Sequence, residues 1–430
     1  MQNIFKVLNV AEGVRICSYN TTQFKTGRLS INLAIPMCTN VAPFAILPYL
    51  LARSSKGYPS LMLLNKKLEE LYGASLSSGL GKHGDNLILS IKMSMVDDRF
   101  ALSGENIFAE CAELLFDIVF NPNILDDAFI LSELEVEKRL MVERIEGEMS
   151  DKRIYALNQM EEYMFEGDLY GNNIYGTIGS VLMLDGKTVY EAYKKVLETA
   201  LITVNVVGSV NSQAIADLFL EKIEKINRHS VMQPKTKVIS SAVSVKEKCE
   251  TLAVKQGKLV MGFRLGMTEK MDNKSRMKIN AMVNIFGGST YSRLFMNVRE
   301  KLSLCYYCSA RARLTKGIMI VQSGVEDENI SVAKEEILHQ LKDMANGNVT
   351  DEDIEKYKLF VKDTCGGICD SPVSIDAWMR DQIVEPSFET PNERLEHSLA
   401  VTKEDVIAAA KAVTLDTVYM LKGDNTDADA

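Results

Sequence analysis

The apolar positions of this chain follow two periods that predict different elements. From Leu89 to Met95 the odd positions are apolar and the even positions are Ser, Lys and Ser, which is the alternation of a half-buried antiparallel strand. Between Ile330 and Met344 the apolar residues recur at spacings of three or four, which predicts an amphipathic helix. Thr350 and Asp353 then have the spacing of a capping box, so a second helix should begin there.

A weak internal repeat relates the two halves of the chain. Thr188–Leu197 has the pattern of a short amphipathic helix that leads into an apolar strand, Ile202–Gly208, and Thr402–Lys411 leads in the same way into Asp416–Gly423. The two closing glycines stand half of the 430-residue chain apart. This correspondence predicts that one supersecondary unit occurs twice.

A second pair of segments supports the repeat. Lys66–Tyr72 has the pattern of a helix end followed by two strand-like stretches, and Met296–Leu302 is followed by two stretches of the same kind. Both halves therefore contain helices and strands, which favours an α+β fold with two homologous halves, each an antiparallel sheet packed with helices.

The best candidate for the boundary between the halves is the segment 227–240, which contains Pro234 and several charged residues. We expect an N-terminal domain over residues 1–228 and a C-terminal domain over residues 235–430.

Charge and composition exclude several classes of function. Lys and Arg number 49 against 58 Asp and Glu, the net charge is −9, and no basic block occurs, so nucleic acid is not an expected partner. The longest apolar run, Val41–Ala52, is shorter than the roughly 20 residues of a membrane span, and the chain start does not resemble a secretory signal. A cytoplasmic protein without membrane contact is expected.

The residue types that usually carry metal or thiol chemistry are sparse. The four histidines include no pair at i and i+4, so no helix can present two imidazoles to one zinc ion. Cys305-x-x-Cys308 and Cys365-Gly-Gly-Ile-Cys369 could form a four-thiolate zinc site, or the first pair could be a redox motif. Cys305 and Cys308, however, lie in a predicted strand, where residues three apart point to opposite faces, so we favour small buried apolar side chains.

A long motif in the second half resembles a known family. The segment reads Gly288-Ser-Thr-Tyr-Ser-Arg-Leu-Phe-Met-Asn-Val-Arg-Glu-Lys-Leu-Ser-Leu-Cys-Tyr-Tyr. It is similar to the pattern Gly-x-x-x-Ser-Arg-Leu-Phe-x-x-Val-Arg-Glu-x-x-x-Leu-x-Tyr in the C-terminal half of M16 metallopeptidases, the pitrilysin and mitochondrial-processing-peptidase type. The chain length and the half-length repeat fit this family too. The resemblance implies the LuxS/MPP-like metallohydrolase fold over nearly the whole chain.

The family's catalytic motif, His-x-x-Glu-His, is missing at the matching place. Aligned on Lys56-Gly57, the two histidine ligands fall on Pro48 and Ala52 and the general base falls on Leu51. The third ligand falls on Arg144, and a slip of one residue would bring in Glu143 but no histidine. A zinc peptidase needs three ligands and a base beside the bound water, so we expect no metal, no other cofactor and no peptidase activity.

The resemblance also implies a substrate-binding pair. Active relatives use an arginine and a tyrosine seven residues later, and Arg299 and Tyr306 have that spacing. The alternative is that Arg299 pairs with a local carboxylate and Tyr306 packs in the sheet.

Metal-less members of this family act as partners of a sibling with intact His-x-x-Glu-His, and the two chains enclose a chamber for unstructured peptides. The chain resembles the bacterial branch linked to modification of elongation factor P with 5-aminopentanol, in length, in Asp370-Ser-Pro-Val-Ser-Ile and in its ligand losses. The expected partner is an active sibling or a second copy, and the expected substrate is an unstructured peptide or protein. An enzyme of changed chemistry, through Cys305 or Glu143, and a stand-alone binding or scaffold protein remain alternatives.

Pro48 sets a structural expectation for the segment Val41–Ala52. Pro43 suits a helix start, but a proline in a helix interior costs roughly 3 kcal/mol relative to alanine. We therefore expect a helix that is kinked at Pro48 or begins there. The apolar residues around it should fill the space that active relatives leave for metal and water: Phe44, Leu47, Leu50 and Leu51.

Overall fold

The computed structural model describes residues 4–228, 230–385 and 387–424, and its contacts divide the chain into two compact units. Unit 1 comprises the chain up to Ile145, Asn173–Lys235 and Gly367–Thr390. Unit 2 comprises Glu146–Asn172, Thr236–Gly366 and the chain from Pro391. The units follow the two halves of the sequence except in two segments, since each half contributes one helical segment to the unit of the other half.

A six-stranded sheet forms the centre of unit 1. Its strands are β1 (Ile4–Ala11), β2 (Val14–Asn20), β3 (Thr26–Pro36), β4 (Ser75–His83), β5 (Asn86–Val96) and β8 (Leu201–Gly208). Their order across the sheet is β1-β2-β8-β3-β5-β4. The strand predicted from the alternation at Leu89–Met95 is the second half of β5, which confirms that prediction.

The sheet of unit 2 repeats this order without a counterpart of β1. Its strands are β9 (Lys246–Leu252), β10 (Gly257–Arg264), β11 (Cys305–Arg313), β12 (Ile318–Val325) and β13 (Thr414–Gly423). They are arranged β11-β12-β10-β13-β9. The two sheets thus have the same topology, and the predicted repeat of two similar α+β halves is confirmed.

Each sheet is mixed rather than wholly antiparallel. β2 pairs with β8 in parallel, β9 pairs with β13 in parallel, and the remaining pairs are antiparallel. A parallel pair requires a long crossover connection, and here nearly a whole half of the chain connects the two strands of each pair. The alternation of apolar and polar residues indicates which face of a strand is buried, but not which distant strand pairs with it. The sequence therefore did not indicate these parallel pairs.

The matching segments of the repeat adopt the expected elements. Helix α8 (Gly186–Thr199) precedes β8 as α15 (Lys403–Ala412) precedes β13. Helix α3 (Leu61–Glu70) precedes β4 and β5, as η4 (Leu294–Lys301), a π-helix, precedes β11 and β12. The segment 230–240 holds neither helix nor strand, as expected of a linker; residue 229 lies outside the described residues.

A layer of helices covers one face of each sheet and completes the two main cores. The helices of this layer, with the short elements near them, are α1 (Ala42–Ala45), α2 (Leu47–Leu51), α4 (Ile107–Phe120), α5 (Leu131–Ser150), α7 (Ile178–Leu182) and α9 (Ser212–Ile223) in the first half, and α10 (Asn273–Val283), η3 (Asn284–Gly288), α11 (Ile330–Ala345), α12 (Asp351–Ile368) and α14 (Pro391–Leu399) in the second.

The helix predicted between Ile330 and Met344 is α11. The predicted capping box begins α12, since the Asp353 amide donates to Thr350 Oγ1 and the Thr350 amide donates to the Asp353 carboxylate. No helix in the described ranges is long and apolar enough to cross a membrane.

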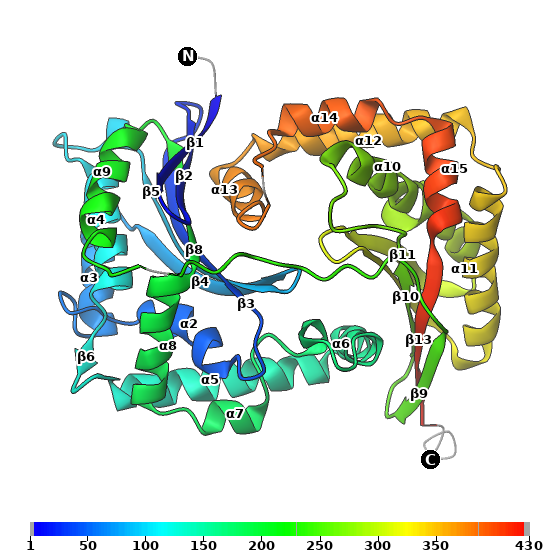
Figure 1. The fold of residues 1–430 in the computed structure, drawn as a ribbon, viewed down its shortest axis with the longest axis horizontal. Coiled ribbons are helices and arrows are strands. Elements are labelled where there is room, and N and C mark those ends of the chain that lie inside the picture. The colour runs from blue at the N-terminus through cyan, green and yellow to red at the C-terminus, as the bar shows by residue number, and fades with distance from the viewer. Residues whose placement is uncertain (1–3, 229, 386, 425–430) are drawn as a thin grey trace. The chain divides into compact units, whose positions relative to one another are not determined.

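One helix from the other half of the chain covers the opposite face of each sheet. Helix α13 (Pro372–Arg380) packs on β3 and β8 of unit 1, and α6 (Lys152–Met164) packs on β10 and β13 of unit 2 (Figure 1). The α6 contact is close: a Cβ atom at Gly262 would lie 2.6 Å from the sulfur of Met164. Glycine at this position lets the helix approach the strand.

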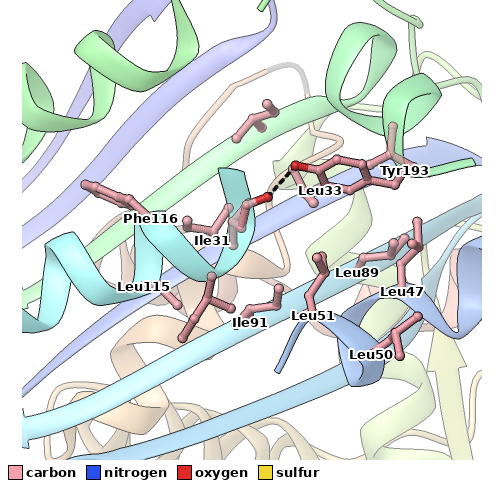
Figure 2. Packing of buried hydrophobic residues seen from close by; sticks show 14 of the residues in the cluster. Ile31, Leu33, Leu47, Leu50, Leu51, Leu89, Ile91, Leu115, Phe116 and Tyr193 are labelled. Atoms are coloured by element: carbon pink, nitrogen blue, oxygen red, sulfur yellow. Dashed lines mark hydrogen bonds between the residues drawn. The ribbon is translucent and has the colours of Figure 1, made fainter. Parts of the chain in front are cut away.

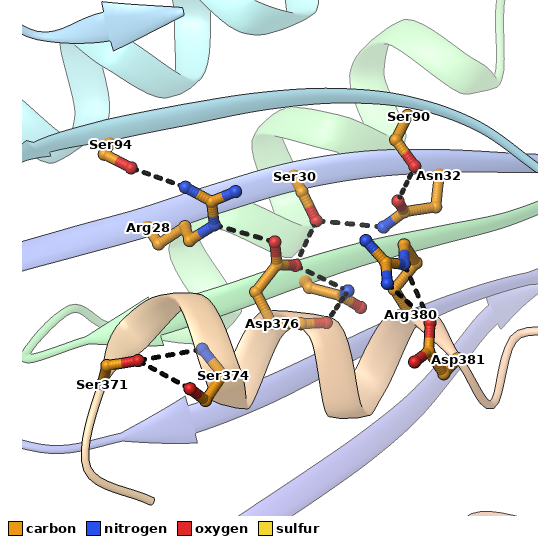
Figure 3. Close-up of polar contacts among 11 residues, drawn as sticks. Arg28, Ser30, Asn32, Ser90, Ser94, Ser371, Ser374, Asp376, Arg380 and Asp381 are labelled. Atoms are coloured by element: carbon orange, nitrogen blue, oxygen red, sulfur yellow. Dashed lines mark hydrogen bonds and ion pairs between the residues drawn. The ribbon is translucent and has the colours of Figure 1, made fainter. Parts of the chain in front are cut away.

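A buried ion pair fixes α13 on its sheet. Asp376, only 2 % exposed, accepts hydrogen bonds from Arg28 Nε at 2.8 Å, Ser30 Oγ at 2.5 Å and Asn205 Nδ2 at 2.9 Å (Figure 3). Arg28 also donates to Ser94 Oγ at 2.7 Å. Both charges are therefore paired and hydrogen-bonded, which is the condition under which buried charges are tolerated.

Removing the carboxylate should destabilise unit 1. We expect Asp376→Asn to lower the free energy of unfolding by about 3–5 kcal/mol, because the buried Arg28 guanidinium would lose its counter-charge. Urea denaturation followed by circular dichroism measures this change.

Asp381→Asn is the matched control at the end of the same helix. Asp381 pairs with Arg380 at 2.7 Å, but its side chain is 58 % exposed, so the loss should be no more than about 1 kcal/mol. Equal losses for the two variants would contradict a special role for the Asp376 pair.

Candidate functional site

The positions that match the family's ligand helix form two short helices in unit 1. Helix α1 ends at Ala45 and α2 begins at Leu47, with Ile46 between them. Pro48 lies in the first turn of α2, where the missing N–H costs no hydrogen bond. The prediction that a helix begins at Pro48 is thus confirmed within one residue.

This segment is packed core rather than an open pocket. Leu47, Leu50 and Leu51 are 1–2 % exposed and belong to the main hydrophobic cluster of unit 1. Figure 2 shows Leu51 among side chains of β5 that include Leu89 and Ile91. The expected burial of the leucines is confirmed, whereas Phe44 is only partly buried and packs at the edge of the cluster.

Arg144, at the position aligned with the third metal ligand, brings a positive charge next to α2. Arg144 lies on α5, half-buried, with its guanidinium carbon 3.9 Å from the ring centroid of Tyr49 in α2. Its Nη1 atom is buried and has no hydrogen-bond partner among the described residues. A guanidinium stays protonated in proteins and cannot ligate a metal, so the stacked Arg144 places a fixed positive charge against α2.

The carboxylates of α5 do not replace the missing ligands. Glu137 accepts a hydrogen bond from Arg53 at 3.0 Å, and Glu133 accepts one from Ser54 at 2.6 Å, so both hold α5 to the segment after α2. Glu143 is exposed and lies 3.8 Å from Arg139. Within the described ranges no three His, Cys, Asp or Glu side chains gather closely enough to hold a metal ion. The suggested four-thiolate zinc site is therefore not formed.

Arg299 and Tyr306 both keep exposed side chains in unit 2. Arg299, on η4, has a side chain 40 % exposed, stacks on Phe295 at 4.6 Å and lies 3.5 Å from the adjacent carboxylate of Glu300. Tyr306, on β11, is 66 % exposed and does not pack into the sheet. Both side chains can reach a ligand, and their role in binding stays a prediction.

The two cysteines of Cys305-x-x-Cys308 do not face opposite sides, so that expectation is wrong. A β-bulge at Tyr306 shifts the register, because Cys305 pairs with Val325 and Tyr307 already pairs with Gly324. Cys308 then pairs with Ser323, on the same face of the sheet as Cys305. The spacing of the two cysteines did not by itself signal this bulge, because it indicates one only when both residues are known to be buried.

A charge at Leu51 should not be tolerated. We expect Leu51→Glu to lower the free energy of unfolding by about 3–5 kcal/mol or to prevent folding, because it removes a buried leucine and buries an unpaired carboxylate. Thermal and urea denaturation measure the loss.

Met62→Glu is the control for introducing the same side chain. Met62 is 75 % exposed in the first turn of α3, where an acidic residue suits the helix dipole, so stability should change by less than about 0.5 kcal/mol. Unchanged stability of Leu51→Glu would mean that the locus can open to water.

Comparisons with known proteins agree with this description. The chain is 30 % identical, over 94 % of its length and 94 % of the relative's, to the "Probable inactive metalloprotease YmfF" of Bacillus subtilis strain 168. A conserved protein from Enterococcus faecalis V583 has the same fold, with a TM-score of 0.88, 24 % identity and coverage of 98 % and 99 % of the two chains. A protease from Helicobacter pylori gives a TM-score of 0.80 at 14 % identity with the same coverage.

A family model also matches the middle of the chain. The model described as "Peptidase M16 inactive domain" matches residues 184–359, which contain η4, β11 and the Arg299–Tyr306 pair. The full-length identity and this match together show that the chain belongs to the M16 peptidase family, as a homologue of a probable inactive metalloprotease.

Proposed function

We propose that this chain is the non-catalytic partner subunit of an active M16 peptidase that carries the intact His-x-x-Glu-His motif. In this role it completes the assembly and helps to bind an unstructured peptide or protein substrate in the cytoplasm. A homodimer, a scaffold protein and an enzyme of changed chemistry are the competing hypotheses that the tests below address.

The observation that carries the proposal is the contrast between the two candidate sites. Leu51, at the position aligned with the general base, is buried among apolar side chains, and each fully buried leucine stabilises the fold by roughly 1.5–3 kcal/mol. Arg299 and Tyr306, by comparison, keep exposed side chains. The chain thus lacks the groups that hydrolysis requires while it retains groups that can contact a substrate.

Arginine and tyrosine are well suited to bind an extended peptide. A guanidinium donates to backbone carbonyls and carboxylates, and a tyrosine ring offers apolar area with little loss of side-chain entropy. Both residue types are enriched among the side chains that dominate protein interfaces. The net charge of −9 favours a substrate or partner surface that is not strongly acidic.

The finer assignment concerns the substrate. The resemblance to the branch linked to 5-aminopentanol modification of elongation factor P supports a pair of subunits that processes a peptide or protein in that modification. Deletion of the gene for this chain should then remove the modification from elongation factor P, as intact-mass spectrometry of that protein would report.

The first functional prediction concerns metal and activity. The purified chain should hold no stoichiometric zinc and should not cleave peptides, whereas a mixture with its active sibling should cleave them faster than the sibling alone. Metal analysis and a fluorogenic peptide assay measure both properties, and co-purification of the tagged chain with the sibling measures assembly.

Restoring single ligand positions gives the control. Pro48→His, Ala52→His or Arg144→Glu should not create activity in the isolated chain, because a zinc site needs all its ligands and its base together. Chelator-sensitive cleavage by the homogeneous wild-type chain would overturn the assignment. Absence of any complex with the sibling would favour the homodimer or the scaffold protein.

The second functional prediction concerns substrate contact. Arg299→Ala and Tyr306→Ala should each weaken binding of an unstructured peptide about tenfold, which corresponds to about 1.4 kcal/mol. Fluorescence anisotropy of a labelled peptide, with the chain in complex with its sibling, measures the change.

Arg311→Ala is the matched control, because Arg311 is an exposed arginine on the same strand as Tyr306. The affinity of this variant should stay within about twofold of wild type. Equal weakening by all three variants would indicate general electrostatic attraction rather than the Arg299–Tyr306 pair.

A further inference from the structure

The thiols of Cys305 and Cys308 form a pair beside the proposed substrate contacts. The bulge at Tyr306 brings both cysteines to the face of β11 that points into the core of unit 2, opposite Val325 and Ser323 of β12. Cys305 is 9 % exposed and Cys308 is 4 % exposed. Ser323, the partner of Cys308 across the two strands, donates its hydroxyl to the Tyr307 carbonyl at 2.9 Å.

The surroundings divide the two thiols into a reactive and a protonated partner. The pKa of Cys305 is lowered to about 7 by the neighbouring Cys308 side chain, by Ser323 and by the positive charge of Arg299, against the opposing effect of burial. The neighbouring Cys305 side chain, together with burial, raises the pKa of Cys308. Cys305 is therefore the more readily deprotonated of the two thiols, and its thiolate would be the nucleophile beside a neutral thiol.

Cys17 and Cys111 lack this environment. Burial raises the pKa of Cys17 to about 11 and that of Cys111 to about 12, so both remain thiols. Cys249 is exposed. These residues serve as internal references for selective reaction at Cys305.

We propose that Cys305 and Cys308 are a peroxide-oxidisable dithiol, and that closure of their disulfide changes peptide binding at Arg299 and Tyr306. The second part rests on the proposed function, since it assumes that these side chains contact substrate.

The reaction is balanced with hydrogen peroxide as the oxidant. The Cys305 thiolate attacks one peroxide oxygen, the O–O bond breaks, and Cys305 becomes a sulfenic acid while hydroxide leaves and is protonated to water. The Cys308 sulfur then attacks the Cys305 sulfur, and the S–O bond breaks with release of a second water. Two thiols and one peroxide thus give one disulfide and two waters, and a dithiol reductant reverses the change.

Closure of the disulfide should move the neighbouring residues. A disulfide requires Cα atoms about 4.4–6.8 Å apart, and here it would enclose only Tyr306 and Tyr307 in its loop. Tyr306 is the extra residue of the bulge, so a tighter loop changes its direction first. The Leu304 amide donates to the Val298 carbonyl at 3.1 Å and thereby links the start of β11 to the helix that carries Arg299.

Mass spectrometry of the full-length chain tests the thiol chemistry directly. After treatment with hydrogen peroxide at about pH 7.5, the peptide that contains both cysteines should lose two hydrogens, and dithiothreitol should restore its mass. The rate should rise as the pH increases through about 7, because deprotonation supplies the thiolate. Cys308→Ser should instead yield a sulfenic acid at Cys305 that dimedone traps, while Cys305→Ser should yield neither product.

Three results of this measurement would overturn the proposed dithiol. No reaction at Cys305, reaction confined to Cys249, or a sulfenic acid that persists in the wild-type chain without a disulfide would each contradict the pair. Because the first measurement uses the wild-type chain, it decides the question even if a serine variant fails to fold.

Peptide affinity tests the regulatory part separately. Reduced and oxidised chains, each in complex with the active sibling, should differ by about threefold or more in peptide Kd, and Cys308→Ser should abolish the difference. Disulfide formation with unchanged affinity would refute control of binding but leave the dithiol standing. Absence of peptide binding in both states would instead refute the proposed function.

Discussion

The position of α13 on the sheet of unit 1 depends on one buried carboxylate. Asp376 receives hydrogen bonds from Arg28 of β3 and Asn205 of β8, which lie 348 and 171 residues away in the sequence. The same interaction covers one face of that sheet, where side chains of β2 and β8 pack against Ile375 and Met379. In unit 2, the ion pair of Glu161 with Arg313 at 2.7 Å holds α6 in the equivalent way. Polar interactions thus fix α6 and α13, each on the sheet of the other half of the chain, while apolar burial supplies most of the stability.

The packing around α2 shows how a fold can keep its architecture without the metal site of its family. Three buried leucines lie in the segment that the motif alignment matches to the ligand helix, and Arg144, aligned with the third ligand, stacks on Tyr49. A metal site must keep polar groups poorly packed and open to water, which costs stability. Apolar residues at these positions remove that cost, so the core around α2 is stabilised by burial alone.

Local features of this structure were predictable from the sequence and distant ones were not. The alternation in β5, the helix α11, its following capping box and the break before Pro48 all depend on neighbouring residues, and the sequence predicts each of them. The parallel pairs and the exchange of α6 and α13 depend on contacts between distant segments, which no local period encodes. At the candidate site the losses at Pro48, Leu51, Ala52 and Arg144 are predictions from the family motif, which no local period indicates. The pairing of Cys305 with Cys308 was missed because a single bulge reverses the facing of a strand.

Each half of the chain supplies a helix to the sheet of the other half, so the order of synthesis affects folding. When the ribosome has completed the first half, one face of the unit 1 sheet is still uncovered, because α13 has not been synthesised. At the usual rates of translation the wait for Asp376 is on the order of ten seconds. During that time the apolar side chains of this face are exposed to other nascent chains and to chaperones. Cutting the gene at the linker would therefore yield two fragments that each lack a helix, and only their coexpression would supply both.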